Sequence, residues 1–326
     1  MTALLVSLAG SGTPLFGGTD TLELRLEGPL TSVVENKEAK QQYPFTLEHA
    51  GNTYEIKVRA RGNSRLRVCA FPPLRLNFKG AGGVFEGADK LKLVTHCRNV
   101  DHSETDVVEE YAVYRMFNLL TDNSLQVRLA RMTYVDTEGN DFSRFTFFLE
   151  PEKDMAERIG TRLSGLGALS RSWIDQEQAA LVYVFAFMVG NTDWSLVTAD
   201  GDTVCCHNEI VVEQDEGRLL VVPYDFDLAG FVDAKYAKPD ASLRTSSVTQ
   251  RRYRGYCTDR GTLRRALDRV IEKETEFMQL IDSLPLLSQK DKAKKKRYLA
   301  GFFKQAKNPE RLVNKFDRRC LGASRR

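Results

Sequence analysis

The sequence lacks a long apolar segment, a zinc-type cysteine pair and an internal repeat. No apolar run reaches the ~18–20 residues that a helix needs to span a bilayer, and none of the six cysteines stands in a C-x-x-C pair. Their even number permits disulfides without requiring them, because a chain of 326 residues can bury a large core. The cysteines are Cys69, Cys97, Cys205, Cys206, Cys257 and Cys320.

The charges that are present are unevenly distributed. The chain has a net charge of +3, with 42% hydrophobic and 28% charged residues, which is ordinary for a globular protein. From Lys290 to Arg326, 14 Lys or Arg stand against 3 Asp or Glu, so this tail carries +11 and the other 289 residues carry −8. A basic tail can bind nucleic acid or anionic lipid, or it can be the solvated face of a helix. We favour the helix, because the acidic body argues against nucleic acid.

The first eighteen residues differ from the rest. Residues 3–9 (ALLVSLA) are apolar and are followed by Gly, Ser, Thr and Pro. This is similar to the end of a secretory signal, but the positively charged segment that precedes such a region is missing. Residues 1–18 are therefore either a signal remnant or a flexible terminus, and the sequence leaves both open.

Residues 19–150 are predicted to form a β-rich lobe. Segments of alternating polar and apolar residues indicate half-buried strands, and turn-like sequences such as RGNSR at 61–65 separate them. Residues 106–120 have apolar residues at helical spacing, with an acid in the first turn, so they predict one helix. The predicted strands are 21–26, 53–59, 74–78, 90–95, 127–135 and 144–149.

Residues 151–326 are predicted to form a helical lobe. A strong helix over 172–189 is apolar nearly all round in its later part, which indicates burial in the centre of the lobe. Two hairpins follow, and further helices run from about residue 261 to the end, including the basic tail. The sequence therefore predicts an α+β fold with a β-rich lobe, a helical lobe and a cleft between them.

Residues 190–230 carry a pattern that suggests a metal site. The Asp-Gly pair at 200–201 is a favoured hairpin turn, and pairing around it places Asp193 opposite Asn208. A second hairpin then places Asn208 opposite Asp225. Directly opposed residues have Cβ atoms roughly 4.5–5.5 Å apart, so three oxygen-bearing side chains would gather at one place.

These oxygens suit Mg²⁺, although they also have plainer uses. Asp227 points the same way as Asp225 if the strand continues, and Mg²⁺ usually combines a few such ligands with waters and substrate phosphates. A register slip of one residue would reverse the facing of a side chain. Asp and Asn are also common in turns and caps, so Asp193 could simply end the preceding helix.

An Asp, then an Asn, then a hairpin and a second Asp resembles the catalytic core of protein-kinase-like enzymes. Further matching segments are RGNSR (61–65), KLKLVTHCRN (90–99), the helix holding Glu109 and Glu110, FFLEP (147–151), GNTDW (190–194) and VPYDFD (222–227). With these motifs, which span about residues 55–235, the chain resembles the CotH (spore coat protein H) kinase family. The resemblance implies a bilobal protein-kinase-like fold, with ATP and Mg²⁺ as cofactors.

The resemblance also implies roles for the residues of the second half. Asp193 would orient or deprotonate an acceptor hydroxyl. Asn208 and Asp225 would hold Mg²⁺, with Asp227 in support. Glu150 would lie near the hinge between the lobes, although a Glu-Pro pair can also be only a turn.

A second implied group surrounds the nucleotide. A helical Glu would form the ion pair that positions a phosphate-binding Lys, and RGNSR would lie near the phosphates, where backbone N–H groups and an Arg meet negative charge. The Glu side chains could equally belong to a solvated helix face, and the Arg side chains could be exposed strand residues. The candidates are Glu109 and Glu110 for the acid, Lys92 and Lys79, with Lys90 behind them, for the lysine, and Arg61 and Arg65 for the arginine.

Two departures from the kinase pattern bear on activity. Asn208 stands 15 residues after Asp193, whereas kinase catalytic loops place the Asn about five residues after the Asp. The HRD, DFG and G-x-G-x-x-G motifs are absent in their usual form, and no nucleotide lysine is obvious. A pseudokinase is therefore an open alternative.

Three functions remain to be distinguished. The leading one is an ATP-dependent phosphotransferase acting on a protein hydroxyl, and the same ligands could hold the nucleotide reversed for AMP transfer. The second is a non-catalytic pseudokinase that serves as a structural or interaction protein of a surface or coat assembly. The third, nucleic-acid binding through the basic tail, is the least favoured. The signal-like start and the resemblance lean towards export, to the periplasm or the exterior, over the cytoplasm.

Overall fold

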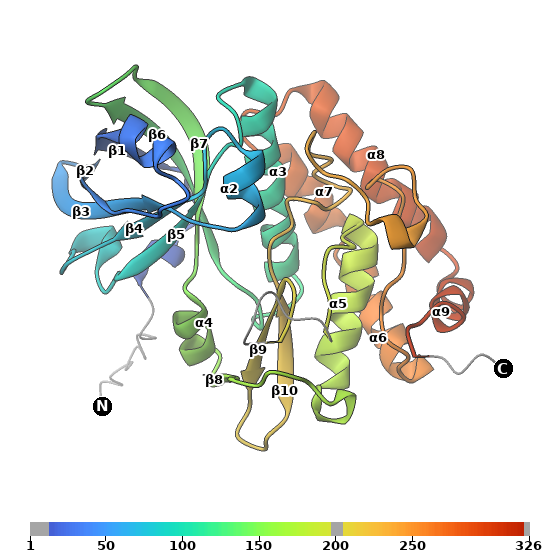
Figure 1. Cartoon of the computed structure of the whole chain (residues 1–326). Helices are drawn as coiled ribbons and strands as arrows, with labels where there is room; N and C mark the ends of the chain where they lie inside the picture. Colours follow the sequence, from blue (N-terminus) through green and yellow to red (C-terminus); the bar gives the residue numbers. More distant parts are fainter. Residues whose placement is uncertain (1–12, 197–204, 323–326) are drawn as a thin grey trace, which may run out of the picture.

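The computed structural model describes residues 13–196 and 205–322, so the signal-like segment 3–9 lies outside the described residues. A closed barrel of seven strands occupies one side of the molecule, and most helices and a small sheet occupy the other (Figure 1). The barrel strands are β1 (Leu22–Gly28), β2 (Tyr43–His49), β3 (Asn52–Ala60), β4 (Leu74–Asn77), β5 (Lys90–Val94), β6 (Val127–Asp136) and β7 (Phe142–Leu149).

The barrel closes because β1 pairs along its whole length with β6. This pairing is parallel and runs from Leu22 with Ala130 to Gly28 with Asp136, and the order around the barrel is β1-β2-β3-β4-β5-β7-β6. The predicted bilobal protein-kinase-like fold, with its β-rich and helical lobes, is therefore wrong, since a closed seven-stranded barrel is not a standard kinase lobe. The closing pair joins strands far apart in sequence, so local patterns carry no sign of it.

The barrel strands alternate as their sequences predict. Along β1, Leu22, Leu24 and Leu26 are buried, and the residues between them are more exposed. In β4 the same period buries Leu74 and Leu76 completely. Because successive side chains of a strand point to opposite faces, this alternation fills the interior with apolar residues and leaves polar residues outside.

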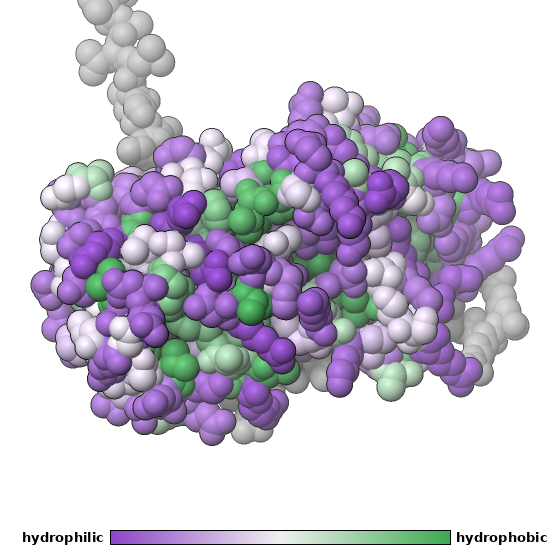
Figure 2. Space-filling model, turned by 90° about the horizontal axis from the view of Figure 1, so that it is seen from above, coloured by the Kyte–Doolittle hydropathy of each residue, from purple (hydrophilic) through white to green (hydrophobic). Residues whose placement is uncertain are grey.

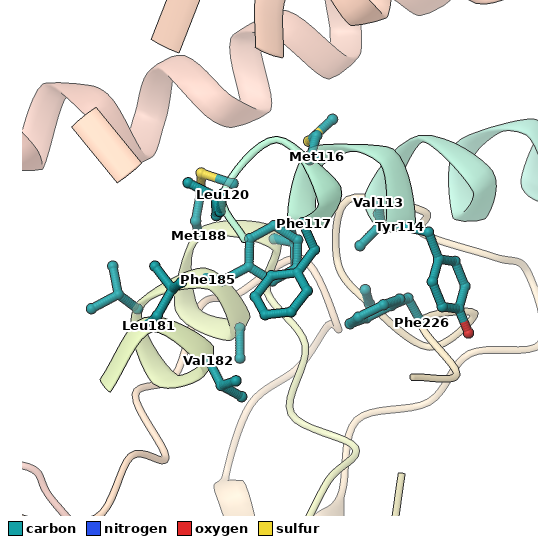
Figure 3. Packing of buried hydrophobic residues seen from close by; sticks show 14 of the residues in the cluster. Val113, Tyr114, Met116, Phe117, Leu120, Leu181, Val182, Phe185, Met188 and Phe226 are labelled. Atoms are coloured by element: carbon teal, nitrogen blue, oxygen red, sulfur yellow. The ribbon is translucent and has the colours of Figure 1, made fainter. Parts of the chain in front are cut away.

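A second hydrophobic core lies between helices α3 (Asp101–Asn118) and α5 (Gln176–Val189). Figure 3 shows Phe117 of α3 against Phe185 of α5, with ring centroids 4.8 Å apart, and Phe226 nearby. The helices predicted over 106–120 and 172–189 are thus confirmed with shifted ends. Burying a Phe side chain contributes about 1.5–3 kcal/mol, so these two helices firmly anchor the segment that carries Phe226.

A three-stranded sheet and the remaining helices surround this core. The sheet has the order β10-β9-β8 with antiparallel pairs. The strands are β8 (Arg162–Leu163), β9 (Glu209–Glu213) and β10 (Leu219–Pro223). The other helices are α1 (Leu30–Glu35), α2 (Ser64–Val68), α4 (Glu152–Arg158), α6 (Arg260–Glu272), α7 (Glu274–Ser283), α8 (Gln289–Ala306) and α9 (Pro309–Asp317). Most of the basic tail therefore lies in α8 and α9, as its pattern predicts.

The face seen in Figure 2 is largely hydrophilic, with hydrophobic residues among the polar ones. The most exposed large hydrophobic side chain, Trp173, is 51% accessible and lies before α5. Among the helices of the described ranges, none combines the length and the apolar character that crossing a membrane would require.

All six cysteines are paired in three disulfides. The first joins the end of α2 to the segment after β5, and the third joins the segment before α6 to the one after α9. The pairs are Cys69–Cys97, Cys205–Cys206 and Cys257–Cys320.

Candidate functional site

Asp193 lies just beyond the carboxyl-terminal end of α5. The helix ends at Gly190, whose φ of 72° is the left-handed conformation that glycine adopts without steric cost. The following turn places the Asn191 side chain where it accepts a hydrogen bond from the Asp193 N–H at 3.0 Å. The partly exposed Asp193 carboxylate meets His207 Nε2, also at 3.0 Å. The end of a buried helix thus fixes the position of this carboxylate.

Asn208 holds Asp193 from the segment that precedes β9. Its Nδ2 donates to the Asp193 carbonyl oxygen at 2.7 Å and to Asp193 Oδ2 at 2.9 Å. Because the two N–H groups of the amide point towards Asp193, the carbonyl oxygen Oδ1 lies on the other side of the amide group. Asn208 is buried, so its amide is held in one orientation next to Asp193.

The predicted strand registers are wrong by one residue. In the β9–β10 hairpin, Pro223 pairs with Glu209, and the Tyr224 N–H donates to the Asn208 carbonyl, so Asn208 lies opposite Tyr224 instead of Asp225. In the first hairpin, a bridge pairs Ser195 with His207, which again shifts the expected register by one. The predicted turn at 200–201 lies outside the described residues.

The backbone leaves the strand conformation at both Asn208 and Asp225. Asn208 has a φ of 52° and Asp225 a φ of 60°. Among residues other than glycine, Asn and Asp adopt these left-handed angles most readily, because their short polar side chains can form local hydrogen bonds. Strand alternation does not apply to such residues, so the strand register alone does not set the direction of their side chains.

Asp225 is anchored through its backbone. Its N–H donates to the hydroxyl of Tyr114 on α3 at 2.7 Å, and the Tyr114 ring packs edge-on against Phe226 at 4.8 Å (Figure 3). Burial, and then the charges of Glu110 and Asp225, raise the pKa of Tyr114 well above its usual value. The neutral hydroxyl therefore holds Asp225, whose carboxylate remains partly exposed to the cleft.

Asp227 faces a different environment. It is buried, accepts a hydrogen bond from Tyr236 Oη at 3.0 Å, and lies 4.0 Å from Arg65 Nε. Burial, followed by the charge of Asp225, raises its pKa to about 7. Its contacts therefore support the neighbouring residues, and its carboxylate is less available as a ligand than that of Asp225.

Arg65 joins the RGNSR segment to α3. Its Nη2 donates to the Thr95 carbonyl at 2.6 Å, and its Nη1 lies 3.8 Å from Glu110 Oε2. Burial lowers the pKa of Arg65, but Tyr236, Asp227 and Glu110 outweigh that effect and raise it. Glu110 is itself buried, and this raises its pKa well above the usual value despite Arg65. The acid predicted to meet a lysine thus lies beside an arginine.

Glu109 is directed away from the cleft. Its Oε2 lies 2.6 Å from Nζ of Lys295 on α8, and both residues are 3% exposed. Burial raises the pKa of Glu109 to about 7 even beside that ammonium group. Glu109 therefore links two helices and lies outside the predicted nucleotide site.

The candidate lysines and Glu150 have other partners. Lys92 Nζ lies 2.5 Å from Glu152 Oε1 at the start of α4, and burial lowers its pKa. Lys79 is exposed in the turn after β4, and Lys90 pairs with its neighbour Asp89 at 3.4 Å. The buried carboxylate of Glu150 pairs with Arg158, at 2.8 Å from Nε and 2.9 Å from Nη2.

Arg61 lies in the same pocket as Asp225. It lines a narrow pocket with the rest of the RGNSR segment, Glu110, Tyr114 and Asp225. Burial lowers the pKa of Arg61, and the charge of Asp225 opposes that shift. The pocket is therefore lined by both a cation and a carboxylate.

The donor set can be compared with the needs of Mg²⁺. In the ranges 13–196 and 205–322, no three His, Cys, Asp or Glu side chains are grouped so as to hold a metal ion. The oxygens available are the Asp225 carboxylate and Asn208 Oδ1, with Asp193 beside them. Mg²⁺ commonly binds through one or two carboxylates together with substrate phosphates, so these residues fit a metal that arrives with a nucleotide.

Three site residues did not stand out in the sequence. The side chain of His207 is 30% exposed and contacts Asp193. Tyr114 and Tyr236 orient Asp225 and Asp227 by hydrogen bonds. The position of His207 next to Asn208 is the one local signal that could have identified it, whereas the tyrosines reach the site through tertiary packing.

No protein-family model matches the chain, and no curated protein sequence matches it. Among solved structures, the chain is similar to the Helicobacter pylori proinflammatory kinase CtkA, with 11% identity and a TM-score of 0.43. The similarity covers 79% of this chain and 96% of that chain. At this level the likeness supports no statement about fold or activity, so any activity has to be inferred from the site itself.

Proposed function

We propose that the chain is a CotH-like atypical kinase that transfers the terminal phosphoryl group of Mg-ATP to a hydroxyl of a protein. One observation carries this proposal. The Asn208 amide donates to the Asp193 carbonyl and to Asp193 Oδ2, and the Asn208 carbonyl accepts from the N–H of Tyr224, the residue before Asp225. This supports a site in which Asp193 is the base and Asn208 and Asp225 supply oxygen ligands, the set that phosphoryl transfer requires.

In the proposed reaction, the acceptor hydroxyl gives its proton to Asp193 while its oxygen attacks the terminal phosphorus. The bond from that phosphorus to the bridging oxygen breaks, and ADP leaves with the electron pair. His207 keeps the Asp193 carboxylate oriented through its contact at 3.0 Å. Asn208 and Asp225 would hold Mg²⁺, which would neutralise phosphate charge when bound.

The cleft is narrow in this structure. The pocket between the RGNSR segment and Asp225 has a volume of about 50 Å³, well below the roughly 300–1,000 Å³ of small-molecule sites. Nucleotide binding therefore requires residues 61–65 to move away from Asp225. A pseudokinase scaffold is the second candidate, because Lys92 pairs with Glu152 and neither Glu109 nor Glu110 is paired with a lysine of the barrel.

Binding is tested by thermal unfolding with ATP, with and without Mg²⁺. At ~100 times its dissociation constant, a ligand adds about 2.7 kcal/mol of stability. We expect Mg²⁺-dependent stabilisation of the wild type and none of Asp225→Ala. Asp215→Ala, an exposed acid in the β9–β10 turn, is the matched control and should behave like the wild type. If ATP with Mg²⁺ stabilised both variants equally, Asp225 would not be part of the binding site.

Transfer is tested with ATP labelled on the terminal or on the α-phosphate, which separates phosphoryl from AMP transfer. Asp193→Asn should retain Mg-ATP binding and lose about 10²–10⁴-fold in rate, the usual contribution of a general base. If the wild type binds Mg-ATP but transfers neither label to any offered protein, the pseudokinase reading takes precedence.

A further inference from the structure

Helices α8 and α9 border a wide groove lined mainly by polar side chains. Its volume is about 1010 Å³, at the upper end of the roughly 300–1,000 Å³ of ligand pockets. Figure 1 places α9 at the edge of the molecule farthest from the barrel, and no lining residue belongs to the candidate site. We call it the α8–α9 groove. The charged residues that line it in the described structure are the cations Lys304, Arg311, Lys315, Arg318 and Arg319 and the acid Glu310.

The acids of α9 pair with a neighbouring helix and leave the groove cations alone. Glu310 Oε1 lies 2.7 Å from Arg264 Nη1 of α6, and its Oε2 lies 3.6 Å from Arg260 Nη2. Asp317 Oδ2 lies 3.7 Å from Arg260 Nη1. Within residues 13–196 and 205–322, no carboxylate pairs with any of the five groove cations. The groove therefore has a net positive charge that the described chain leaves unpaired.

The cations of the groove lie close to one another. Lys315 is the clearest case, because burial lowers the pKa of its ammonium group and neighbouring cations lower that pKa further. Those cations are Arg319, Arg252, Arg251 and Arg311, in order of decreasing effect. Like charges at close range repel one another. An anion in the groove would offset this repulsion, whereas a cation would add to it.

The amide groups of the groove also favour a ligand rich in oxygen acceptors. The Asn308 Oδ1 accepts from the Arg311 backbone N–H at 3.0 Å, and the Asn314 Oδ1 accepts from Arg260 Nη1. Both oxygens are thus occupied, and the two amide NH₂ groups remain as donors, neither of them with a protein partner in the described structure. The groove therefore presents mainly cations and hydrogen-bond donors, which are the complement of carboxylates and peptide carbonyls.

The lining distinguishes a protein segment from other polyanions. Sites for single-stranded nucleic acid stack bases on aromatic side chains, and the described lining includes none. Membrane-binding helices combine cations with exposed apolar side chains, whereas the apolar lining residue Leu312 is 2% exposed. A concave site also receives one extended chain more readily than a flat bilayer. An acidic polypeptide, which carries both carboxylates and backbone carbonyls, therefore fits best.

We propose that the α8–α9 groove binds an acidic segment of a partner protein, whose carboxylates pair with Arg311 and Arg319. Both arginines are exposed, and each guanidinium group can hold a carboxylate through two parallel N–H donors. Salt screens exposed ion pairs, so the interaction depends on ionic strength. It does not rest on the proposed function, because no residue of the candidate site takes part, and either proposal can fail without the other.

The test is fluorescence anisotropy of labelled octaglutamate with the full chain, at two salt concentrations. We expect the wild type to bind it with an affinity that falls as salt rises. Arg311→Gln/Arg319→Gln should weaken binding about tenfold, the effect of losing two exposed ion pairs, and Arg311→Lys/Arg319→Lys should restore part of the loss. Lys290→Gln/Arg297→Gln removes two exposed charges of α8 that do not line the groove and should change binding less than about twofold.

Equal binding of octaglutamate by Arg311→Gln/Arg319→Gln and the wild type would overturn the proposal, as would no measurable binding by the wild type. Tighter binding of a single-stranded oligonucleotide with the same number of charges would assign the groove to nucleic acid instead. Tighter binding of vesicles containing phosphatidylserine would assign it to a membrane. Circular dichroism of each variant separates lost binding from lost folding. If the double glutamine variant does not fold, Arg311→Gln alone replaces it, with about half the loss in binding free energy.

Discussion

Glu209, the residue after Asn208, is an acid inside a hydrophobic core. Its side chain is 3% exposed, and neither carboxylate oxygen has a hydrogen-bond partner in the described structure. Burial raises its pKa well above the usual value, so the folded protein keeps Glu209 protonated at pH values where the unfolded chain releases the proton. Folding stability therefore falls as pH rises above the unfolded pKa of about 4.5 towards the folded pKa.

Glu209→Gln should remove this pH-dependent loss, because glutamine is neutral at every pH. We expect the stability of the variant relative to the wild type to increase between pH 4 and pH 8, as measured by urea unfolding across that range. Glu216→Gln, 83% exposed in its side chain, serves as control and should show no such trend. If the difference in unfolding free energy between the variant and the wild type stays constant with pH, Glu209 is not a buried neutral acid.

Residue types in the candidate site could be predicted, but their geometry could not. Asp193, Asn208 and Asp225 were expected to converge from hairpin pairing, and the structure brings Asp193 and Asn208 into direct contact. The predicted registers were wrong by one residue, because the left-handed angles of Asn208 and Asp225 arise from packing that no spacing rule records. The tyrosine that anchors Asp225 comes from α3, far away in sequence.

At the scale of elements, a buried ion pair joins α3 to α8. The Lys295 Nζ lies 2.6 Å from Glu109 and also donates to the carbonyls of Phe231 and Val232, at 2.6 and 3.1 Å. Lys295→Met would leave Glu109 without its partner in the core, and breaking a buried pair this way costs about 3–5 kcal/mol. We expect a loss of that size in the free energy of unfolding, measured with urea.

The neighbouring lysine supplies the control for this experiment. Lys294 pairs with Asp233 at 3.1 Å on the surface, so Lys294→Met should cost about 0–1 kcal/mol. Adding Glu109→Gln to Lys295→Met removes the unpaired buried carboxyl group and should recover part of the loss. If Lys295→Met cost no more than Lys294→Met, the pair would not couple the two helices.

Individual elements were predictable where one period dominates. The alternation in β1, β4 and β5 and the apolar run of α5 led to the correct element types. Closure of the barrel was not predictable, because it depends on the parallel pairing of β1 with β6, and outer polar faces look the same in an open sheet and a barrel. The partner of Glu109 was missed for a similar reason, since Lys295 lies in a tail whose other charges are mostly solvated.

At the scale of the whole molecule, the carboxyl-terminal segment is tied back towards the site. The Leu321 N–H donates to the Gly255 carbonyl at 2.9 Å, and the Cys257 N–H donates to the Leu321 carbonyl at 3.1 Å. One residue before Gly255, Arg254 donates to the Thr192 carbonyl at 2.8 Å, next to Asp193. Leu321 thus supports the segment at 254–257. Arg254 of that segment in turn holds Thr192, the residue before the candidate base Asp193.

The disulfide between Cys257 and Cys320 fixes this arrangement across a sequence separation of 63 residues. Closing a loop of that length stabilises the folded state by about 4 kcal/mol through the lost entropy of the unfolded chain. The double variant Cys257→Ser/Cys320→Ser should therefore lose about that much in urea unfolding, and a reductant should destabilise the wild type by at least as much. Cys69→Ser/Cys97→Ser, with a separation of 28 residues, opens a shorter loop and should lose slightly less. Unchanged stability of the first variant would show that hydrogen bonds alone hold the chain end, and an oxidising compartment would then confer no benefit through this pair.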